Sequence, residues 1–442
     1  MSSSSSKIEV KFLIDKEQQR VVFAEAGSDF VDLLFSFLTL PLGRIVRLLG
    51  KKSGWGSLDS LYESVEQLDA KLFQTEACKK MLLNPRSAAA KQCEGFKIKG
   101  IHERNPRRFY TCSQDDCQIQ YTCNYYSYAS KVLCSRCGKF MDAAWQWEKL
   151  TADEEGFIDI GTPDFIITDD LQVTLHSFKK GLSLFKQFHI EDSSVLEEKV
   201  MGFGTQEALK LLGRLLVSKS ALTDIYFPDS YGQNNEDFAL PINERLGADG
   251  EEKKISFELI LNKKNNKVLY AEADDDFVDQ LVSFLTFPLG SVLKFHSGNI
   301  LSFGGCIQNL YSSAERINLE FFKSNNCRNM LLTPMLPTFY GIKNQILELK
   351  ETESLKATVP RSCRKCYPDN GSKICKSAPC MHGISAQEYI EQNPKLVNRA
   401  PDNDELSDND ESSDDDGAFV VSSKNLWFRM TFIFLRYQSS LQ

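Results

Sequence analysis

The sequence predicts an α+β fold made of two tandem homologous modules, each with a β-hairpin, several helices and a cysteine-rich insert resembling a zinc ribbon. The first observation is a repeat, since residues 24–43 recur at 271–290 with fifteen of twenty positions identical. The second is that strand-like alternation precedes helical periodicity in both copies. The third is that a group of cysteines follows the helices in each copy. The second copy is shorter, so we expect the second module to be truncated.

The length and charge of the chain limit what it can be. It has 442 residues, of which 42% are hydrophobic and 25% are charged. Single cores rarely grow beyond about 300 residues, so this length predicts two or three structural units. The formal net charge of −8 disfavours binding of the whole chain to nucleic acid, although a local basic patch stays open.

Neither a secretory signal nor a membrane span is recognisable in the sequence. Residues 1–7 are rich in serine and lack the apolar stretch of a secretory signal. The best candidate for a membrane span, residues 426–435, is interrupted by Arg429 and is shorter than the roughly 20 apolar residues that a spanning helix needs. We therefore expect an intracellular protein, in the cytoplasm and/or nucleus, without membrane contact. In that reducing compartment the 13 cysteines favour metal binding over disulfides.

Each copy opens with a predicted hairpin. Residues 8–14 alternate apolar and polar side chains, a polar turn follows, and residues 21–24 are predicted to return as the second strand. Residues 255–261 and 268–271 repeat this pattern in the second copy. We therefore expect a half-buried sheet at the start of each module.

Two helices are predicted after each hairpin. The first begins at a short carboxylate, Asp29 or Asp276, which suits an N-cap, and it ends before Pro41 or Pro288. The second helix covers residues 58–81, with apolar residues at alternating intervals of three and four. This spacing is typical of a coiled-coil dimer seam or of an ordinary core face, and the short length favours the core face.

The remaining segments complete a division of the chain into parts. In copy one, strands are predicted at 165–168 and 171–175 and a helix at 205–218. Residues 417–420 correspond to the segment at 156–158 that follows the cysteines of copy one. The parts are a disordered N-terminus (1–6), module 1 (7–228, cysteine cluster at 109–140), a linker (229–253), an incomplete module 2 (254–400, cysteine cluster at 363–382), an acidic disordered segment (401–417) and an atypical C-terminal tail (418–442).

The first cysteine cluster has the spacing of a zinc site. Cys112 and Cys117 are separated by four residues, and Cys134 and Cys137 form a Cys-x-x-Cys that continues into Gly138. Two cysteine pairs on separate turns can supply the four thiolates that Zn²⁺ binds in structural sites. The glycine permits the left-handed turn that follows such a pair.

The second cluster offers four cysteines at a different spacing. Cys363 and Cys366 form a Cys-x-x-Cys, Cys375 and Cys380 follow, and His382 is an alternative ligand. We expect structural zinc at both clusters, the alternative being a set of free or buried thiols. A site closed by four thiolates leaves no open coordination position, so metal catalysis is not expected.

Basic and aromatic residues surround the first cluster, a combination that suits single-stranded nucleic acid. The acidic balance of the chain, with Asp115 and Asp116 inside the cluster, favours a solvated basic loop instead. Nucleic-acid binding is therefore kept as an alternative. The residues concerned are Lys97, Lys99, Arg104, Arg107, Arg108, Lys131, Arg136 and Lys139, with Tyr110, Tyr121, Tyr125, Tyr126 and Tyr128.

None of the common catalytic motifs appears in the sequence, which contains five histidines in all. Cys78 and Cys327 recur in both copies, and we expect them to be buried helical cysteines rather than reactive thiols. The leading expectation is a non-catalytic interaction or scaffold protein with a protein partner, because two modules raise avidity. An enzyme of unrecognised type is the remaining alternative.

Several motifs together resemble one family. They are VVFAEAGSDFVDLLFSFLTLPLG and its second copy VLYAEADDDFVDQLVSFLTFPLG, the FYTC and CSRCGKFM segments, FIITDDLQV and SKSALTDIYF. The family is the land-plant group known as domain of unknown function 674. The resemblance covers the chain up to about Val420 and implies tandem modules without an assigned activity. The C-terminus departs from the family pattern, in which the second copy would continue into a further strand and a leucine-rich helix.

Overall fold

The computed structural model describes residues 7–103, 108–112, 125–146, 155–159, 161–228, 257–264, 267–296, 305–343, 345, 347–354, 356–359, 387–396 and 417–421. The predicted N-terminal segment 1–6, the linker 229–253, most of the acidic segment 401–417 and the tail beyond residue 421 lie outside these ranges. None of the helices found within them has the length and apolar character needed to span a membrane.

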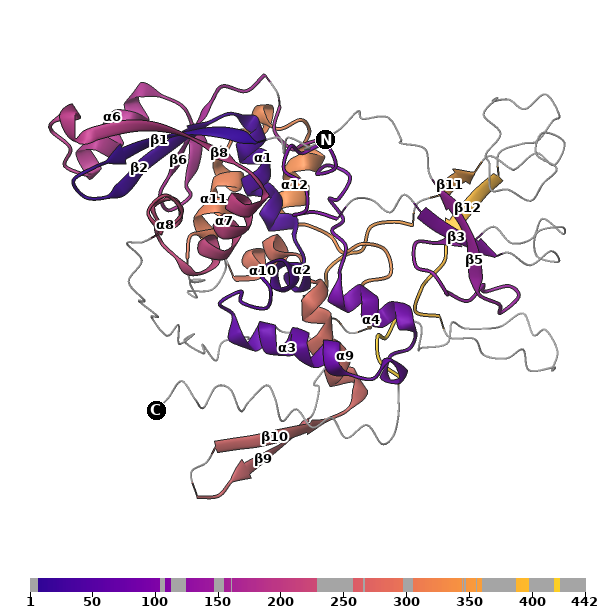
Figure 1. Cartoon of the computed structure of the whole chain (residues 1–442). Coiled ribbons are helices and arrows are strands. Elements are labelled where there is room, and N and C mark those ends of the chain that lie inside the picture. Colours follow the sequence, from indigo (N-terminus) through magenta and orange to yellow (C-terminus); the bar gives the residue numbers. More distant parts are fainter. Residues whose placement is uncertain are drawn as a thin grey trace, which may run out of the picture.

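A five-stranded antiparallel sheet is the frame of the first copy, in the order β7-β6-β2-β1-β8 (Figure 1). Along β1, Val10 and Phe12 are fully buried while Glu9 is exposed and Lys11 is half-buried, so the predicted alternation is confirmed. The β1–β2 pairing confirms the predicted hairpin. The strands are β1 (Ile8–Asp15), β2 (Arg20–Ala26), β6 (Phe165–Thr168), β7 (Val173–Leu175) and β8 (Leu196–Phe203).

Helices cover the inner face of this sheet, and the fold is α+β. The helix predicted at 205–218 is confirmed as α7, whose N-terminal amide at Gly204 binds the Glu207 carboxylate at 2.9 Å. The helical elements of copy one are α1 (Ser28–Ser36), η1 (Phe37–Thr39), α2 (Leu42–Leu48), α3 (Gly56–Gln67), η2 (Ala70–Leu72), α4 (Glu76–Leu83), α6 (Phe178–Gln187), η3 (Ser193–Val195), α7 (Thr205–Val217) and α8 (Ala221–Tyr226).

The second copy repeats the start of the first. Its hairpin, β9 (Phe257–Asn262) with β10 (Lys267–Ala273), is a two-stranded sheet among the described residues. The helical elements that follow are α9 (Asp275–Ser283), η5 (Phe284–Thr286), α10 (Leu289–His296), α11 (Ile307–Arg316), η6 (Leu319–Phe321) and α12 (Asn325–Leu332).

Both predicted N-caps are wrong by two residues. α1 begins after Gly27, which has no capping side chain, and Asp29 lies inside the first turn. α9 is capped by Asp274, whose carboxylate accepts from the Phe277 N–H at 2.9 Å, and Asp276 again lies in the first turn. A carboxylate in the first turn is favoured by the helix dipole, so sequence alone does not separate the two roles.

The single helix predicted over residues 58–81 is wrong, because the structure contains two helices there. α3 ends at Gln67, and α4 begins after Thr75, whose hydroxyl accepts from the Cys78 N–H at 3.3 Å. Leu61 and Val65 are nevertheless buried, so the core-face interpretation of α3 holds. The second copy has the same break between α11 and α12.

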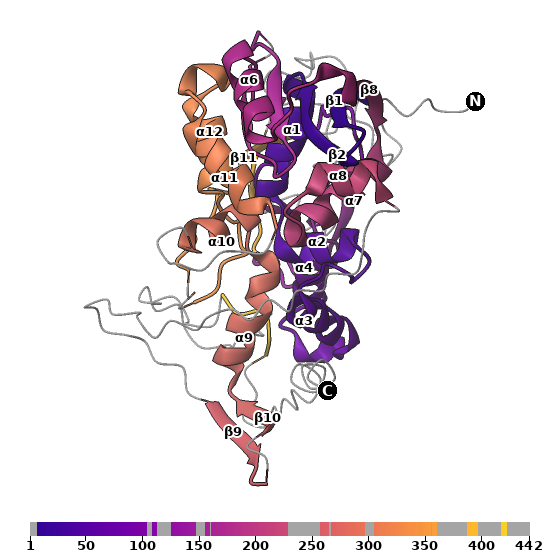
Figure 2. The same ribbon diagram turned by 90° about the vertical axis from the view of Figure 1, so that its left-hand side faces the viewer.

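The two copies meet at their Pro-Leu-Gly segments and make the same contacts with each other. The Leu42 N–H donates to the Phe287 carbonyl at 3.0 Å, and the Leu289 N–H donates to the Leu40 carbonyl at 2.9 Å. In Figure 2 the helices of the second copy accordingly lie alongside α1 and α2. The contact is reciprocal, as expected if two similar units face each other across an approximate two-fold axis.

A second reciprocal contact uses the two segments 157–158 and 419–420, which we call the bridging segments. Asp32 accepts hydrogen bonds from both N–H groups of segment 157–158, each at 2.9 Å. Asp279 accepts equivalent bonds from segment 419–420, the shortest at 2.9 Å. This equivalence confirms the predicted correspondence between the two segments.

Each bridging segment then pairs with the other copy. Segment 157–158 of copy one bridges to Phe322 of copy two, and segment 419–420 bridges back to Phe73 of copy one. The largest buried cluster therefore contains residues of both copies, for example Phe30 together with Leu310. Although the sequence divides into two modules, the apolar core is shared between them.

Candidate metal centre and surface groove

Three of the predicted metal ligands lie together at one end of a second sheet. The sheet has the order β11-β12-β4-β3-β5, and Cys112 is the last residue of β3. Cys134 and Cys137 lie in the turn that precedes β5. The strands are β3 (Arg108–Cys112), β4 (Tyr125–Ser127), β5 (Met141–Gln146), β11 (Lys356–Val359) and β12 (Gln387–Glu391).

The sulfur atoms are close enough to share one ion. The three ligand atoms lie within 4.8 Å of one another, and the Cys112 and Cys137 sulfurs are 3.4 Å apart. Cys112 and Cys134 are buried, and Cys137 is half-buried. Gly138 has φ of 69°, as predicted for the turn after the Cys-x-x-Cys, and its N–H donates to the Cys134 carbonyl at 2.8 Å.

The chemistry of these donors fits a soft metal ion such as zinc. The thiols pack against Val132 and Met141 and offer soft ligands. Cys117, the predicted fourth ligand, lies outside the described residues, as do Cys363, Cys366, Cys375 and Cys380 of the second cluster.

Strands of both copies form the sheet that carries the cysteines. β12 of the second copy pairs in parallel with β4 of the first, with Ile390 opposite Tyr125. Beyond this strand, the Gln392 N–H donates to the Tyr126 carbonyl at 2.6 Å, and the Thr75 hydroxyl donates to the Pro394 carbonyl at 2.8 Å. The prediction of one separate insert per module did not include this pairing.

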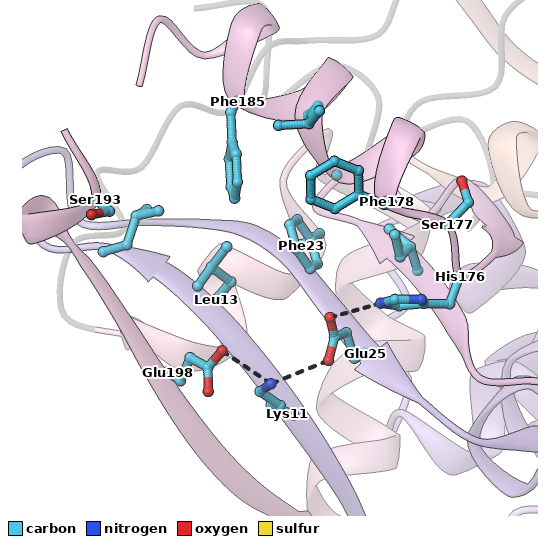
Figure 3. A pocket seen from close by; sticks show the side chains of 14 residues that line it. Lys11, Leu13, Phe23, Glu25, His176, Ser177, Phe178, Phe185, Ser193 and Glu198 are labelled. Carbon is cyan, nitrogen blue, oxygen red and sulfur yellow. Dashed lines mark hydrogen bonds and ion pairs between the residues drawn. The ribbon is translucent and has the colours of Figure 1, made fainter. Parts of the chain in front are cut away.

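A groove of about 470 Å³ runs along the outer face of the main sheet, beneath α6 (Figure 3). Its floor is formed by side chains of β1, β2 and β6, and its rim by α6 and the start of β8. Phe178 is 80% exposed and Leu182 is 42% exposed, although both are apolar. Apolar residues in the lining are Leu13, Phe23, Ile166, Phe178, Leu182, Phe185 and Leu196.

A chain of charged groups closes one end of the groove. The Lys11 ammonium lies 3.0 Å from Glu198 and 3.3 Å from Glu25, and the second oxygen of Glu25 lies 3.2 Å from His176 Nε2 (Figure 3). The hydrogen bond to Glu198, followed by that to Glu25, raises the pKa of Lys11. The lysine therefore stays charged throughout the physiological range.

Sequence reasoning did not identify this groove, because its lining comes from distant segments of the chain. Lys11 and Glu25 occupy outward positions on paired strands, where a polar residue is ordinary. A signal was nevertheless present, since α6 places Phe178 and Leu182 on the side away from its buried Leu184. A helix that buries one apolar side against its own sheet and exposes apolar residues on another side indicates a surface for a ligand or partner.

Cys78, Cys327 and Asp169 have structural roles. Cys78 and Cys327 are buried, as predicted, and burial raises the pKa of the Cys78 thiol. The Asp169 carboxylate accepts from the Thr223 N–H and hydroxyl, both at 2.7 Å, so it fixes the turn between β6 and β7. Burial raises the pKa of Asp169 to about 6.

The fold and the site together define an α+β protein in which two similar copies share a core, and in which the first copy carries a three-cysteine cluster. The family model described as "Protein of unknown function (DUF674)" matches residues 4–364 and, in a second match, residues 301–425. The chain therefore belongs to this family, as its motifs predicted. No curated protein and no solved structure matches the chain.

Proposed function

We propose that this protein is a non-catalytic interaction protein that holds a protein partner in the groove beneath α6. The exposed apolar lining of the groove carries the proposal, since Phe178 and Leu182 lie beside Phe23 and Phe185 in a concave surface. Apolar side chains gathered in an exposed concave site are typical of a surface that a ligand or partner covers.

The charges at the end of the groove specify the chemistry of the partner. Glu25 and Glu198 supply two carboxylates, and Lys11 supplies one ammonium between them. Two carboxylates against one ammonium leave a negative balance among these three groups, so a basic side chain is favoured there. We therefore propose an amphipathic helical segment whose apolar side covers Phe178 and whose lysine or arginine reaches the carboxylates.

The absence of catalysis belongs to the proposal. Ser177 and His176 are neighbours in the groove, but the Ser177 hydroxyl accepts from the Lys180 N–H at 3.2 Å and so caps α6. His176 in turn contacts Glu25, which is already engaged by Lys11. These bonds give the polar residues of the groove a structural role, which is to hold its shape.

The cysteine cluster is proposed to act as a structural element. Zn²⁺ bound by Cys112, Cys134 and Cys137, with Cys117 as a fourth thiolate, would complete a zinc ribbon at the end of β3 and β5. The ion would supply folding free energy to the sheet that joins the two copies. A second structural zinc at Cys363, Cys366, Cys375 and Cys380 is part of the same proposal, as is an intracellular location that keeps the thiols reduced.

The groove is tested by comparing partners captured by matched variants. Leu182→Glu places a charge in the apolar lining, and Met335→Glu makes the same change at a residue that is 40% exposed and outside the groove. We expect partners captured by the wild type and by Met335→Glu to be lost with Leu182→Glu. Binding of each purified partner is then measured by calorimetry, with an expected weakening of at least tenfold.

The proposal is contradicted if the purified partners bind Leu182→Glu as tightly as the wild type. A second variant, Glu25→Gln, tests the contribution of charge to partner binding separately from that of the apolar lining. It should weaken the binding of a partner segment that carries a lysine or arginine. It should leave unchanged the binding of the same segment when that residue is replaced by glutamine. Equal binding of both segments would remove the charge argument and keep the apolar one.

Nucleic-acid binding remains the second candidate, favoured by exposed basic residues around the cysteines. Lys131 has 66% of its side chain exposed, and Lys139 is also exposed. Tyr126 is not available to stack on a base, because it is fully buried and packs edge-on against Phe109 and Tyr128. Labelled single strands that bind the full chain at low salt and dissociate as salt rises would favour this candidate.

A further inference from the structure

Strand β8 forms one edge of the main sheet. It pairs with β1 over all eight of its residues without a register shift, and no described strand pairs with its outer side. The opposite edge, β7, has only three residues. In Figure 2, β8 lies at the outer margin of the sheet, beside β1. A long and regular edge strand is a ready surface for pairing with another chain.

The middle of β8 is exposed on both faces of the strand. Val200 is 67% exposed although it is apolar, and the side chains of Glu198 and Lys199 are 62% and 49% exposed. Consecutive side chains alternate between the two faces of a strand, so this exposure means that neither face is covered here. The edge is therefore accessible to a second strand.

The hydrogen bonds between β1 and β8 determine which backbone groups of β8 point outward. The Lys16 N–H donates to the Val195 carbonyl at 3.0 Å, so these two residues form a hydrogen-bonded pair at the end of the ladder. Hydrogen-bonded and non-hydrogen-bonded pairs alternate along antiparallel strands. Glu198 is consequently in a non-hydrogen-bonded pair, and its N–H and carbonyl point away from β1. The same holds for Leu196 and Val200.

A second copy of β8 can satisfy these groups when it runs antiparallel about a two-fold axis through Glu198. Glu198 then lies opposite its own counterpart, and Leu196 lies opposite Val200 of the second copy. In this register every outward N–H and carbonyl of the three residues finds a partner. The contact is the same from both sides, as a two-fold interface requires.

The charges on β8 favour this register over its neighbours. Glu197 and Lys199, which lie 2.7 Å apart within one chain, come opposite Lys199 and Glu197 of the second copy. These are non-hydrogen-bonded pairs, in which side chains across antiparallel strands are closest. The two ion pairs then form a ring of alternating charges. An axis through Glu197 or Lys199 would instead place like charges directly opposite each other, which destabilises a sheet.

The pair of glutamates at the axis is compensated from β1. The Lys11 ammonium lies 3.0 Å from Glu198, so each copy brings one lysine to the two carboxylates. On the same face of the sheet the exposed Val200 meets the half-buried Leu196 of the second copy. Apolar cross-strand pairs of this kind stabilise antiparallel sheets.

We propose that two copies of this chain pair through β8 and form one continuous sheet across both molecules. The contact between two strands is smaller than a typical stable interface, so the dimer is reversible and forms at high protein concentration. The two-fold axis is perpendicular to the sheet, so both grooves beneath α6 open on the same face of it. The inference rests on the edge of the sheet and does not depend on the proposed function of the groove.

Sedimentation equilibrium of the full-length chain over a wide range of concentrations tests the association. We expect an equilibrium between monomer and dimer. Lys199→Glu should weaken the dimer at least tenfold, because the ring then holds only glutamates. Glu197→Lys combined with Lys199→Glu exchanges the two charges and should restore the dimer. Lys80→Glu, which breaks an exposed ion pair with Glu76 on α4, is the matched control and should associate as the wild type does.

Val200→Pro tests the backbone bonds. Its N–H points away from β1, so a proline there removes a donor to the second copy and none within the chain. We expect at least tenfold weaker dimerisation with unchanged thermal unfolding of the monomer. If the proline variant does not fold, Lys199→Glu still tests the same edge, because it alters only an exposed charge.

Glu198→Cys tests the register. Residues opposite each other in a hydrogen-bonded antiparallel pair have Cα atoms about 5.5 Å apart, a distance that a disulfide spans. Oxidised glutathione should therefore link two chains through residue 198, as identified by mass spectrometry of the linked peptide. Val200→Cys should give no link between the two positions 200, because each lies opposite Leu196.

A wild-type chain that stays monomeric at every concentration would overturn the proposal. A dimer that both Lys199→Glu and Val200→Pro leave unchanged would also overturn it, because another surface would then form the contact. The same conclusion follows if Glu198→Cys gives no linked peptide while the chain is dimeric.

Discussion

At the scale of single residues, two buried aspartates organise the contact between the copies. Burial raises the pKa of Asp32 to about 6 and that of Asp279 to about 7, although each carboxylate accepts two backbone N–H bonds that act in the opposite direction. In both cases desolvation outweighs the hydrogen bonds. The stability of the folded chain should therefore depend on the protonation of these two carboxyl groups.

The sign of the resulting pH dependence follows from linkage. The pKa of Asp279 rises from 3.8 to about 7, so between these pH values the folded chain binds a proton that the unfolded chain does not. The free energy of unfolding must then fall as pH rises through this window. Asp279→Asn cannot ionise and keeps an oxygen that can accept both bonds, so its stability should fall less between pH 4 and 8.

Urea unfolding at pH 5 and pH 8 measures this difference. The matched control is Asp276→Asn, which changes an exposed carboxylate on the same helix and should follow the wild type. If Asp279→Asn and the wild type lose stability in parallel over this range, the aspartate is not the group responsible.

Much of the cysteine site was predictable at this scale, and the groove was not. Cys112, Cys134 and Cys137 were named from spacing alone, because thiolate pairs on short turns have few other uses in a reducing compartment. Lys11 and Glu25 were not named, since each is an ordinary outward residue on its own strand. Only the pairing of β1 with β2, and of β1 with β8, brings Lys11 between Glu25 and Glu198.

At the scale of elements, the glycines of the two Pro-Leu-Gly segments lie very close to backbone atoms of both copies. A Cβ at Gly290 would lie 2.5 Å from the Leu331 carbonyl oxygen and 3.0 Å from that of Leu38. A Cβ at Gly43 would lie 2.9 Å from the Leu285 carbonyl oxygen. These contacts are with backbone, which cannot move as a flexible side chain can.

Gly290→Ala should therefore destabilise the protein by about 1–3 kcal/mol through overpacking. Gly181→Ala, in the open part of α6, should be neutral or stabilise by roughly 0.5–1 kcal/mol, because alanine is the better helix former. Thermal and urea unfolding of the two variants check the pair. A Gly290→Ala protein as stable as the wild type would show that α10 can move away from Leu331.

The elements themselves were predicted unevenly. Both hairpins and α7 follow from local alternation and periodicity, which the tertiary structure does not override. The break between α3 and α4 was missed because Leu68 and Leu72 continue the apolar spacing, although Leu68 ends α3 in an extended conformation. The hydroxyl of Thr75 capping α4 was the local signal.

At the scale of the whole molecule, the shared core predicts one cooperative unit. The largest cluster contains residues of both copies, so neither copy can bury its apolar surface alone. Calorimetry of the full chain should show a single unfolding transition. A fragment of residues 1–253 should aggregate or remain partly unfolded, because Phe30 and its neighbours lose the cover of α11. A soluble fragment with native-like exchange protection would contradict this.

The sequence division into two modules did not anticipate the shared core. Periodicity shows which face of a helix is buried, but it does not show whether the covering element belongs to the same copy. Ile307 on α11 reads as a core residue of copy two, whereas it lies in a cluster with β7 of copy one. The bridging segments could not be placed from the sequence for the same reason. Each donates backbone hydrogen bonds to an aspartate of its own copy and forms a β-bridge with the other copy.

Metal removal is the last test at this scale. Mass spectrometry of the protein purified without a metal-chelating tag should find at least one zinc ion per chain, and two if the second cluster also binds. Chelation should lower the melting temperature, and Cys134→Ser should do the same without chelator. Cys306→Ser, at a buried thiol far from the cluster in sequence, should leave the zinc content unchanged. A metal-free protein of unchanged stability would remove the structural zinc.

The second bridging segment has a consequence for synthesis on the ribosome. Phe73 emerges early, but its pairing partner Val420 is made about 350 residues later. At translation rates of roughly 5–20 residues per second, this edge of the first copy waits on the order of 20–70 seconds for its partner. Throughout that interval the nascent chain carries an unfinished apolar core. Chaperones that bind nascent chains should therefore associate with this protein until its final residues are made.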